Sequence, residues 1–329
     1  MPRIHQLSLA TLRCSAVEGA RALSLALLDQ VGATLPRLQT RKDQEALHDF
    51  RVAVRRLRAC LRAHRGLFDK KTVTISRKRL REIVTATGSA RDAEVQLQGI
   101  EAQDTTWMKA DLTGVNLIRE RLGVQIEGGY RNGLDVIARE YPDVEKSLYS
   151  YFGNVDPPPG GPFPAYLASS IGEHRADLAG KLARAFAPID ENRLHRARIS
   201  AKRLRYLIEP LVSEVPRTAK VVDTLKSLQD LLGDIHDLQG LGHGIQAVLD
   251  GLKHERKDWF TNLSSGAVGP RPQSPPALAG LKKLAGVVRE DQDRLLKSLR
   301  AHWMGGAEVP FFDDVAQLEA RVGGPADRR

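Results

Sequence analysis

Hydrophobic residues recur along most of this chain at steps of three and four positions, which places them on one face of an α-helix. In the first half, this pattern predicts helices over about 15–35, 43–65 and 74–87, a fourth that starts near Ala90, and long helical segments that follow to about 140. The last of these segments ends at Tyr141-Pro142, because proline disfavours helix in the residue before it. In the second half, the pattern predicts helices near 163–186, 190–213, 217–232, 234–256 and 277–303. No segment alternates as a β-strand would, so we expect an all-α fold.

Proline and glycine divide these helical segments into two halves. The run Pro157-Pro158-Pro159-Gly160-Gly161-Pro162 cannot be helical. After Met304 we expect only a loosely docked tail. The predicted parts are a first helical half at 1–156, a linker at 157–162, a second helical half at 163–305 and a tail at 306–329.

One block of basic residues occurs once in each half, with the second copy 147 positions after the first (48 to 195). The first block contains His48, Arg51, Arg55, Arg56 and Arg58, and the second contains His195, Arg198, Lys202, Arg203 and Arg205. A second pair follows at Gly88-x-x-Arg91-Asp92 and Gly233-x-x-His236-Asp237. A motif repeated together with its neighbour indicates an internal duplication. Duplicated helical units normally pack about a pseudo-twofold axis, which would direct both basic faces towards one groove or channel.

Each basic block forms a stripe on its predicted helix. At about 100° per residue, His48, Arg51, Arg55, Arg58 and Arg62 lie within a sector of about 80°. The opposite faces are apolar and are expected to be buried: Leu47, Phe50, Val54, Leu57 and Leu61 in the first block, and Leu194, Ala197, Ala201, Leu204 and Ile208 in the second. Arg56 and Arg203 lie off the stripes, where they either flank the groove or pair with acids.

The charge pattern of the stripes favours an anionic ligand. Solvated helix faces usually mix signs, because like charges at this spacing repel. Between His48 and Arg65, however, there are six arginines and only one acid, Asp49. Arginine stays ionised, and its planar group fits phosphate oxygens. The residues expected to broaden this basic surface are Lys78, Arg81, Arg91, Lys226 and His236.

Composition agrees with a polyanionic partner. The 329 residues carry a formal net charge of +10, and 42% of them are hydrophobic. Cys14 and Cys60 are the only cysteines, and we expect them to be small buried side chains in a reducing compartment. No apolar run reaches the ~20 residues that span a membrane. We therefore expect a cytoplasmic protein.

The paired blocks and the two Gly-x-x-Arg/His-Asp turns resemble the CHAD family, named for a conserved histidine in an α-helical domain. The resemblance covers about residues 10–305 and implies two pseudo-symmetric helical bundles around a basic channel. It also implies binding of inorganic polyphosphate and association with polyphosphate granules, where granule proteins are possible partners. Carried onto this chain, the ligand-facing residues are His48, Arg51, Arg55, Arg58, His195, Arg198, Lys202 and Arg205.

Other functions fit the residues less well. Nucleic acid is also a phosphate chain, but single-strand binders add aromatic platforms, and only Tyr206 lies near the stripes. A granule or protein-interaction scaffold fits the charge but not the duplication. His48 and His195 stand beside guanidinium groups that repel metal ions, and no nucleophile–base set or P-loop is present. We therefore expect no metal, cofactor or catalysis, with Asp92 and Asp237 in structural roles, either in the first turn of a helix or orienting an arginine.

Overall fold

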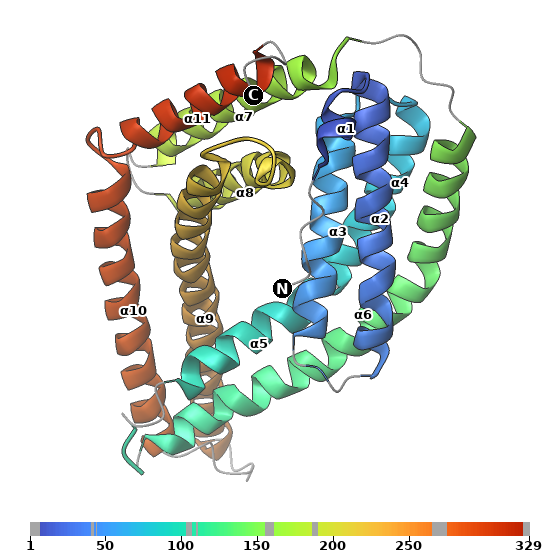
Figure 1. Cartoon of the computed structure of the whole chain (residues 1–329). Coiled ribbons are helices and arrows are strands. Elements are labelled where there is room, and N and C mark those ends of the chain that lie inside the picture. The colour runs from blue at the N-terminus through green and yellow to red at the C-terminus, as the bar shows by residue number, and fades with distance from the viewer. Residues whose placement is uncertain are drawn as a thin grey trace. The chain divides into compact units, whose positions relative to one another are not determined.

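The structure is a computed structural model of the chain, and it describes residues 7–40, 43, 45–102, 107–109, 111–154, 161–185, 190–264 and 275–324. Every regular element in these ranges is a helix, which confirms the all-α prediction (Figure 1). A single isolated β-bridge between Ser15 and Pro162 accompanies them. The helices are α1 (Leu9–Leu12), α2 (Ala16–Thr40), α3 (Ala46–Ala63), α4 (Lys70–Ala86), α5 (Gly88–Glu101), α6 (Leu112–Asn154), α7 (Phe163–Ala185), α8 (Glu191–Ile208), α9 (Thr218–Ser264), α10 (Pro275–Trp303) and α11 (Val309–Gly323).

The predicted apolar faces are the buried faces. In α3, Leu47, Phe50, Val54, Leu57 and Leu61 are all buried, and so are Leu194, Ala197, Ala201, Leu204 and Ile208 in α8. Side chains spaced one helical turn apart share a face, so the spacing alone was sufficient to identify both sets. Burial of these faces anchors α3 and α8 in the core, and the basic stripes lie on the other sides of the two helices.

Two predicted helix boundaries are wrong. The helix α6 continues through Pro142 to Asn154, with Tyr141 and Val144 buried on either side of the exposed proline. A proline removes one backbone hydrogen bond, and the apolar packing of its neighbours outweighs that loss here. Likewise, α9 runs without a break through Gly233, where the sequence pattern predicts a boundary between two helices. Glycine is unfavourable inside a helix by only about 1 kcal/mol.

The expectation of a loosely docked tail is wrong for residues 309–323. They form α11, which packs against α7 and buries Phe311, Val315, Leu318 and Val322. Arg175 of α7 also pairs with Glu319 of α11, with 3.2 Å between the guanidinium and carboxylate atoms. The four buried side chains follow three- and four-residue steps, so the segment carried the same helical signal as the rest of the chain.

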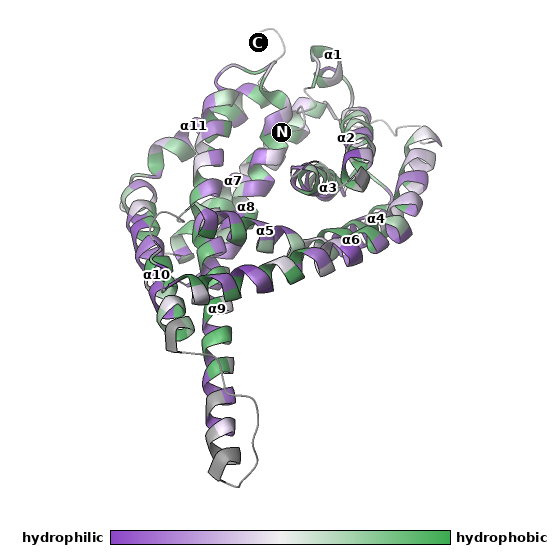
Figure 2. Cartoon of the chain, turned by 90° about the horizontal axis from the view of Figure 1, so that it is seen from below, coloured by the Kyte–Doolittle hydropathy of each residue, from purple (hydrophilic) through white to green (hydrophobic). Residues whose placement is uncertain are grey.

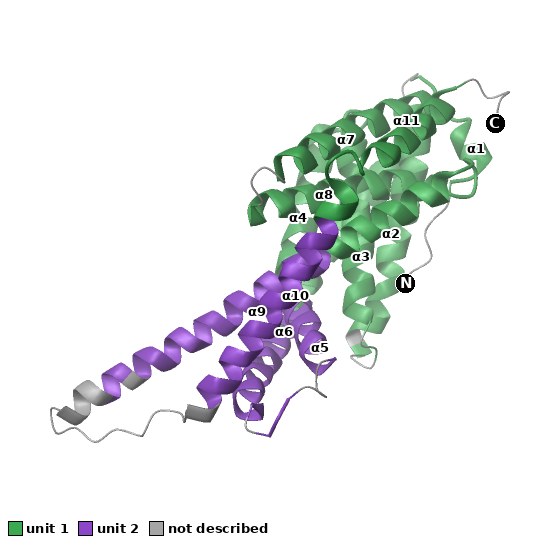
Figure 3. Cartoon of the chain, turned by 90° about the vertical axis from the view of Figure 1, so that its left-hand side faces the viewer, with its two compact units in different colours: residues 1–88, 131–232, 300–329 green, residues 89–130, 233–299 purple. Residues whose placement is uncertain are grey.

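The chain forms two compact units, which differ from the predicted halves (Figure 3). The first unit comprises residues 1–88, 131–232 and 300–329, and the second comprises residues 89–130 and 233–299. The predicted boundaries at 156 and 163 and the internal duplication stay predictions, and residues 157–160 of the predicted linker lie outside the described residues.

Within the first unit, α3 occupies a central place. It packs against α2, α4 and α8, and α7 packs against α2, α8 and α11. The two basic blocks, far apart in sequence, thus lie on helices that are in direct contact.

The second unit has its own core. Ile100, Ile118, Ile245 and Leu284 are among its buried residues. The beginnings of α6 and α10 touch closely, because a Cβ atom on Gly280 would lie 2.1 Å from the carbonyl oxygen of Asp111. Only glycine permits that approach.

None of the described helices is both long enough and apolar enough to cross a membrane. Hydrophilic residues recur along each of the long helices (Figure 2).

Candidate functional site: an arginine cluster on α3, α4 and α8

The basic residues of α3 take up two different environments. Arg51 and Arg56 are buried, whereas His48, Arg55, Arg58 and Arg62 are only partly buried. A buried guanidinium needs partners to replace water, whereas a partly exposed one remains accessible to a ligand. The basic residues of α3 therefore include structural cations as well as cations that could bind a ligand.

Arg51 is one of the structural cations. Its Nη1 donates to the carbonyl oxygen of Val84 at 2.6 Å and to the hydroxyl of Thr87 at 2.7 Å. Val84 and Thr87 lie at the end of α4, where carbonyl groups lack partners within the helix and where positive charge is favoured. Arg51 therefore ties α3 to the end of α4, a role that the spacing of the stripe does not predict.

Arg56 is the second structural cation, and its partner lies 153 positions away. The side chain of Glu209, which is only 2% exposed, accepts hydrogen bonds from Arg56 of α3 and pairs with Arg205 of α8, each at 3.1 Å. The ring of Tyr206 lies below both guanidinium groups, at 5.8 Å from Arg56 and 5.1 Å from Arg205. Of the two alternatives for Arg56, pairing with an acid is the one the structure shows. One carboxylate thus neutralises one cation from each basic block.

Five other arginines form a cluster with few counter-charges, which we call the arginine cluster. It consists of Arg58 and Arg62 from α3, Arg77 and Arg81 from α4, and Arg203 from α8. Burial, followed by repulsion from Arg77, Arg81, Arg203 and Arg62, lowers the pKa of Arg58 to about 10.

The same forces act on two other members of the cluster. Burial and then the charges of Arg62 and Arg65 lower the pKa of Arg77. Burial and then Arg62 lower the pKa of Arg203, against an attraction to Asp177. Among the described residues, no member of the cluster forms an ion pair within 4 Å. A concentration of positive charge with so few counter-charges attracts anions.

Part of the hydrogen-bonding capacity of these side chains is also unused. The Nε atoms of Arg55 and Arg58 are buried, and neither has a hydrogen-bond partner among the described residues. Buried donors without partners are unfavourable by about 1–3 kcal/mol each. A ligand rich in oxygen acceptors would satisfy such donors.

Comparisons with solved structures show the same fold in known proteins. The crystal structure of the CHAD domain from the plant Ricinus communis aligns at 18% identity with a TM-score of 0.61, covering 96% of each chain. PptA from Streptomyces chartreusis aligns at 14% identity with a TM-score of 0.63, covering 92% of this chain and 100% of that chain. At these identities, the likeness shows the fold alone. No curated protein matches the chain.

The family itself is decided by a sequence model of the CHAD domain, which matches residues 22–246. The chain belongs to the CHAD family. CHAD domains are linked to polyphosphate binding in general, and they are generally binding domains rather than catalytic ones. The match includes α3, α4 and α8, so all five arginines of the cluster lie within the CHAD domain.

The remaining predicted ligand residues of this CHAD domain lie on the same two basic helices. His48 on α3 is partly buried, and His195 on α8 is exposed. Arg198 and Lys202, also on α8, are partly buried. Their contact with a ligand stays a prediction.

The predicted periphery is divided between the two units. Arg81 joins the arginine cluster, and Lys78 is exposed on the same helix. Lys226 pairs with Asp223 at 3.0 Å. Arg91 and His236 belong to the second unit, where Arg91 pairs with Glu94 at 3.1 Å.

The first-turn positions predicted for the two aspartates are wrong. Neither Asp92 nor Asp237 lies in the first turn of a helix, because α5 begins at Gly88 and α9 begins at Thr218. Asp92 is exposed and Asp237 is partly buried. The error follows from treating Gly233 as a break and from placing the start of α5 too late.

Two important residues were missed by sequence reasoning. Arg77 lies four positions before Arg81, so helical spacing alone would have placed the two on one face. Glu209 lies four positions after Arg205, a spacing typical of ion pairs within a helix. Its pairing with Arg56, in contrast, depends on the packing of α3 against α8, which no local pattern reveals.

Proposed function

We propose that this CHAD domain binds inorganic polyphosphate through the arginine cluster and the other accessible residues of the two basic stripes, namely His48, Arg55, His195, Arg198 and Lys202. The observation that carries the proposal is the gathering of Arg58, Arg62, Arg77, Arg81 and Arg203 from three helices without an ion pair among the described residues. Polyphosphate is a flexible chain of closely spaced anions with no bases to stack. It therefore matches a dense cationic surface that is poor in aromatic rings.

The physical argument rests on repulsion. Folding brings these guanidinium groups together although the other four all disfavour the charged form of Arg58. A bound polyanion attracts each of these charges and offsets their mutual repulsion, so binding is favourable and stabilises the folded chain. Binding without catalysis is part of the proposal, since the cluster holds neither a nucleophile nor a base.

The test is a competition experiment at fixed salt. Labelled long-chain polyphosphate bound to the protein is displaced by unlabelled polyphosphate, single-stranded DNA or double-stranded DNA. We expect polyphosphate to compete best, because nucleic acid has a lower charge density along its chain and finds few aromatic platforms here. If either nucleic acid competes equally well per phosphate, the chain is a nucleic-acid-binding protein and the proposal is wrong.

Matched variants locate the site. The triple variant Arg58→Gln, Arg62→Gln and Arg77→Gln removes three charges from the cluster and spares Arg51 and Arg56, which have structural partners. The control removes three exposed charges from α6 by Arg121→Gln, Arg131→Gln and Arg139→Gln. We expect the cluster variant to bind polyphosphate at least about tenfold more weakly, and its salt dependence to fall by about one unit of slope for each phosphate that is no longer neutralised. Equal losses of affinity in both variants would mean that only net charge matters.

Association with polyphosphate granules in the cytoplasm would follow from this binding. A fluorescent fusion of the chain should co-localise with granules, and the cluster variant should not. Co-localisation that survives the loss of polyphosphate binding would instead favour a scaffold that contacts granule proteins.

A further inference from the structure

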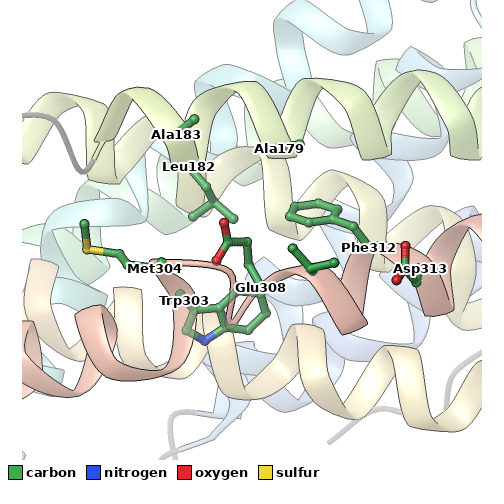
Figure 4. A pocket seen from close by; sticks show the side chains of 10 residues that line it. Ala179, Leu182, Ala183, Trp303, Met304, Glu308, Phe312 and Asp313 are labelled. Atoms are coloured by element: carbon green, nitrogen blue, oxygen red, sulfur yellow. The ribbon is translucent and has the colours of Figure 1, made fainter.

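A pocket of about 480 Å³ lies apart from the arginine cluster, between α7 and the junction of α10 with α11 (Figure 4). All of its lining residues belong to the first unit. Its volume falls within the range of about 300–1,000 Å³ that is typical of small-molecule sites.

The shape of the pocket depends on the turn that separates α10 from α11. Gly305 and Gly306 have φ angles of +66° and +98°, which side-chain-bearing residues rarely adopt. The carboxylate of Glu308 accepts a hydrogen bond from the backbone nitrogen of Gly306 at 3.1 Å and so holds the turn. Beyond the turn, α11 packs against α7.

The walls of the pocket are mainly apolar. Leu182 of α7 and Trp303 at the end of α10 are buried, and Phe312 of α11 is partly buried. The ring of Trp303 is fixed by an edge contact with Phe311, at 5.3 Å between centroids. Val309 completes the lining and is 51% exposed, although it is a large apolar residue. An apolar surface of this kind favours an occupant with an apolar body.

The charges at the pocket have the opposite sign to those of the cluster. Glu308 and Asp313 are the only charged residues in its lining, and neither forms an ion pair with another described residue. The adjacent acid, Asp314, differs because it pairs with Lys220 at 2.7 Å. In a chain with a net charge of +10, two uncompensated carboxylates beside an apolar cavity select against anions and favour a cation.

We infer that this pocket binds organic cations that combine an apolar, preferably aromatic, body with an amino or guanidino group. The body packs against Leu182, Trp303 and Phe312, and the cationic group lies beside the carboxylate of Glu308, with Asp313 on the far side of Phe312 (Figure 4). The aromatic walls add an attraction for the cation. This site is independent of the arginine cluster in both charge and location.

The test compares three probes that share one indole ring: tryptamine, which is a cation; tryptophol, which is neutral; and indolepropionate, which is an anion. Binding to the full chain is measured by calorimetry and by saturation-transfer NMR. We expect tryptamine to bind about fivefold more tightly than tryptophol, as an attraction between partly exposed charges allows. We expect indolepropionate to bind more weakly than either. Equal affinities for tryptamine and tryptophol, or no binding of tryptamine, would overturn the inference.

Variants separate charge from shape. Glu308→Gln with Asp313→Asn should reduce the affinity for tryptamine to that for tryptophol, and the amide oxygen introduced by Glu308→Gln can still accept the hydrogen bond from Gly306. The control, Asp314→Asn, alters the same helix outside the pocket and should change neither affinity. Ala183→Leu adds a larger side chain at an exposed position in the pocket lining and should weaken the binding of all three probes. Undiminished binding in the Ala183→Leu variant would place the probes elsewhere and refute the assignment.

Discussion

His64 lies at the end of α3, fully buried between the rings of Phe163 and Tyr166. Neither ring nitrogen has a hydrogen-bond partner among the described residues. Burial, with a smaller effect from His174, lowers the pKa of His64 from 6.5 to about 4. The folded chain therefore requires the neutral imidazole.

A pH dependence of stability follows from this residue. The pKa of His64 is lower in the folded chain than in the unfolded chain. Its contribution to the free energy of unfolding is therefore fully present above pH 6.5 and is lost as the pH falls from 6.5 to about 4. At pH 5, we expect the chain to be about 2 kcal/mol less stable than at pH 7.5 through this group alone. Urea unfolding of the native chain and of His64→Phe at both pH values measures the difference. If the variant shows the same loss as the native chain, other groups cause it.

Glu209 forms an ion pair with one arginine from each of the two basic helices, α3 and α8. Its replacement by Gln would leave Arg56 buried without a counter-charge, so we expect the free energy of unfolding to fall by about 3 kcal/mol. The double variant Arg56→Met with Glu209→Gln removes the buried cation as well and should be more stable than Glu209→Gln alone. Denaturant unfolding of the set gives both values. A double variant that is no more stable than the single one would show that Arg205, not Arg56, needs the carboxylate.

At the scale of helices, Arg51 makes α3 and α4 depend on one another. Replacing it by Gln removes a charge from the end of α4 and leaves the carbonyl of Val84 with a weaker donor. We expect a loss of about 1–2 kcal/mol in stability, while Arg58→Gln, which breaks no ion pair or hydrogen bond among the described residues, should leave stability unchanged or raise it. Thermal melting distinguishes the two. An equal effect of both substitutions would remove the distinction between structural and ligand-facing arginines.

A second prediction at this scale concerns the final helix, α11. Removing residues 309–329 would uncover the surface of α7 that α11 covers, and would lose the burial of Phe311, Val315, Leu318 and Val322. Fully burying each such side chain contributes about 1.5–3 kcal/mol. We therefore expect the truncated chain to melt at a much lower temperature and to bind a hydrophobic dye. A truncated chain with native melting behaviour would show that α11 is dispensable.

The elements themselves were largely predictable, and the reasons are local. Faces such as Leu47–Phe50–Val54 and Leu194–Ala197–Ala201 follow directly from helical periodicity. The continuity of α6 and α9 was not predictable from the same signals, because Pro142 and Gly233 favour a break locally and only tertiary packing outweighs them. In the site, Arg58 and Arg62 were identified from the first stripe, and Arg203 from its place in the second basic block beside the stripe. That Arg51 and Arg56 have structural roles instead could not be predicted, because their partners Val84 and Glu209 come near them only in the folded chain.

For the whole molecule, the proposed function predicts how binding depends on ligand length and salt. The basic blocks lie on α3 and α8, two helices in contact, so a long polyphosphate can occupy both at once. We expect chains of about 100 phosphates to bind at least about tenfold more tightly than tripolyphosphate, and both affinities to fall steeply with added salt. Titrations at several salt concentrations measure both trends. Equal affinity for tripolyphosphate and long chains would limit the site to a single short anion pocket.

The division of the chain into units also has a consequence for its synthesis. The first unit takes its residues from three separate stretches, the last of which holds α11, whereas the second unit ends at Leu299. A ribosome that has translated Leu299 has therefore made every residue of the second unit, while the first still lacks the helix that covers α7. The nascent chain must carry that uncovered apolar surface until α11 has been translated, a period in which chaperones commonly protect incomplete folds. A stop codon within α11 would thus damage a unit whose other two stretches had already been translated.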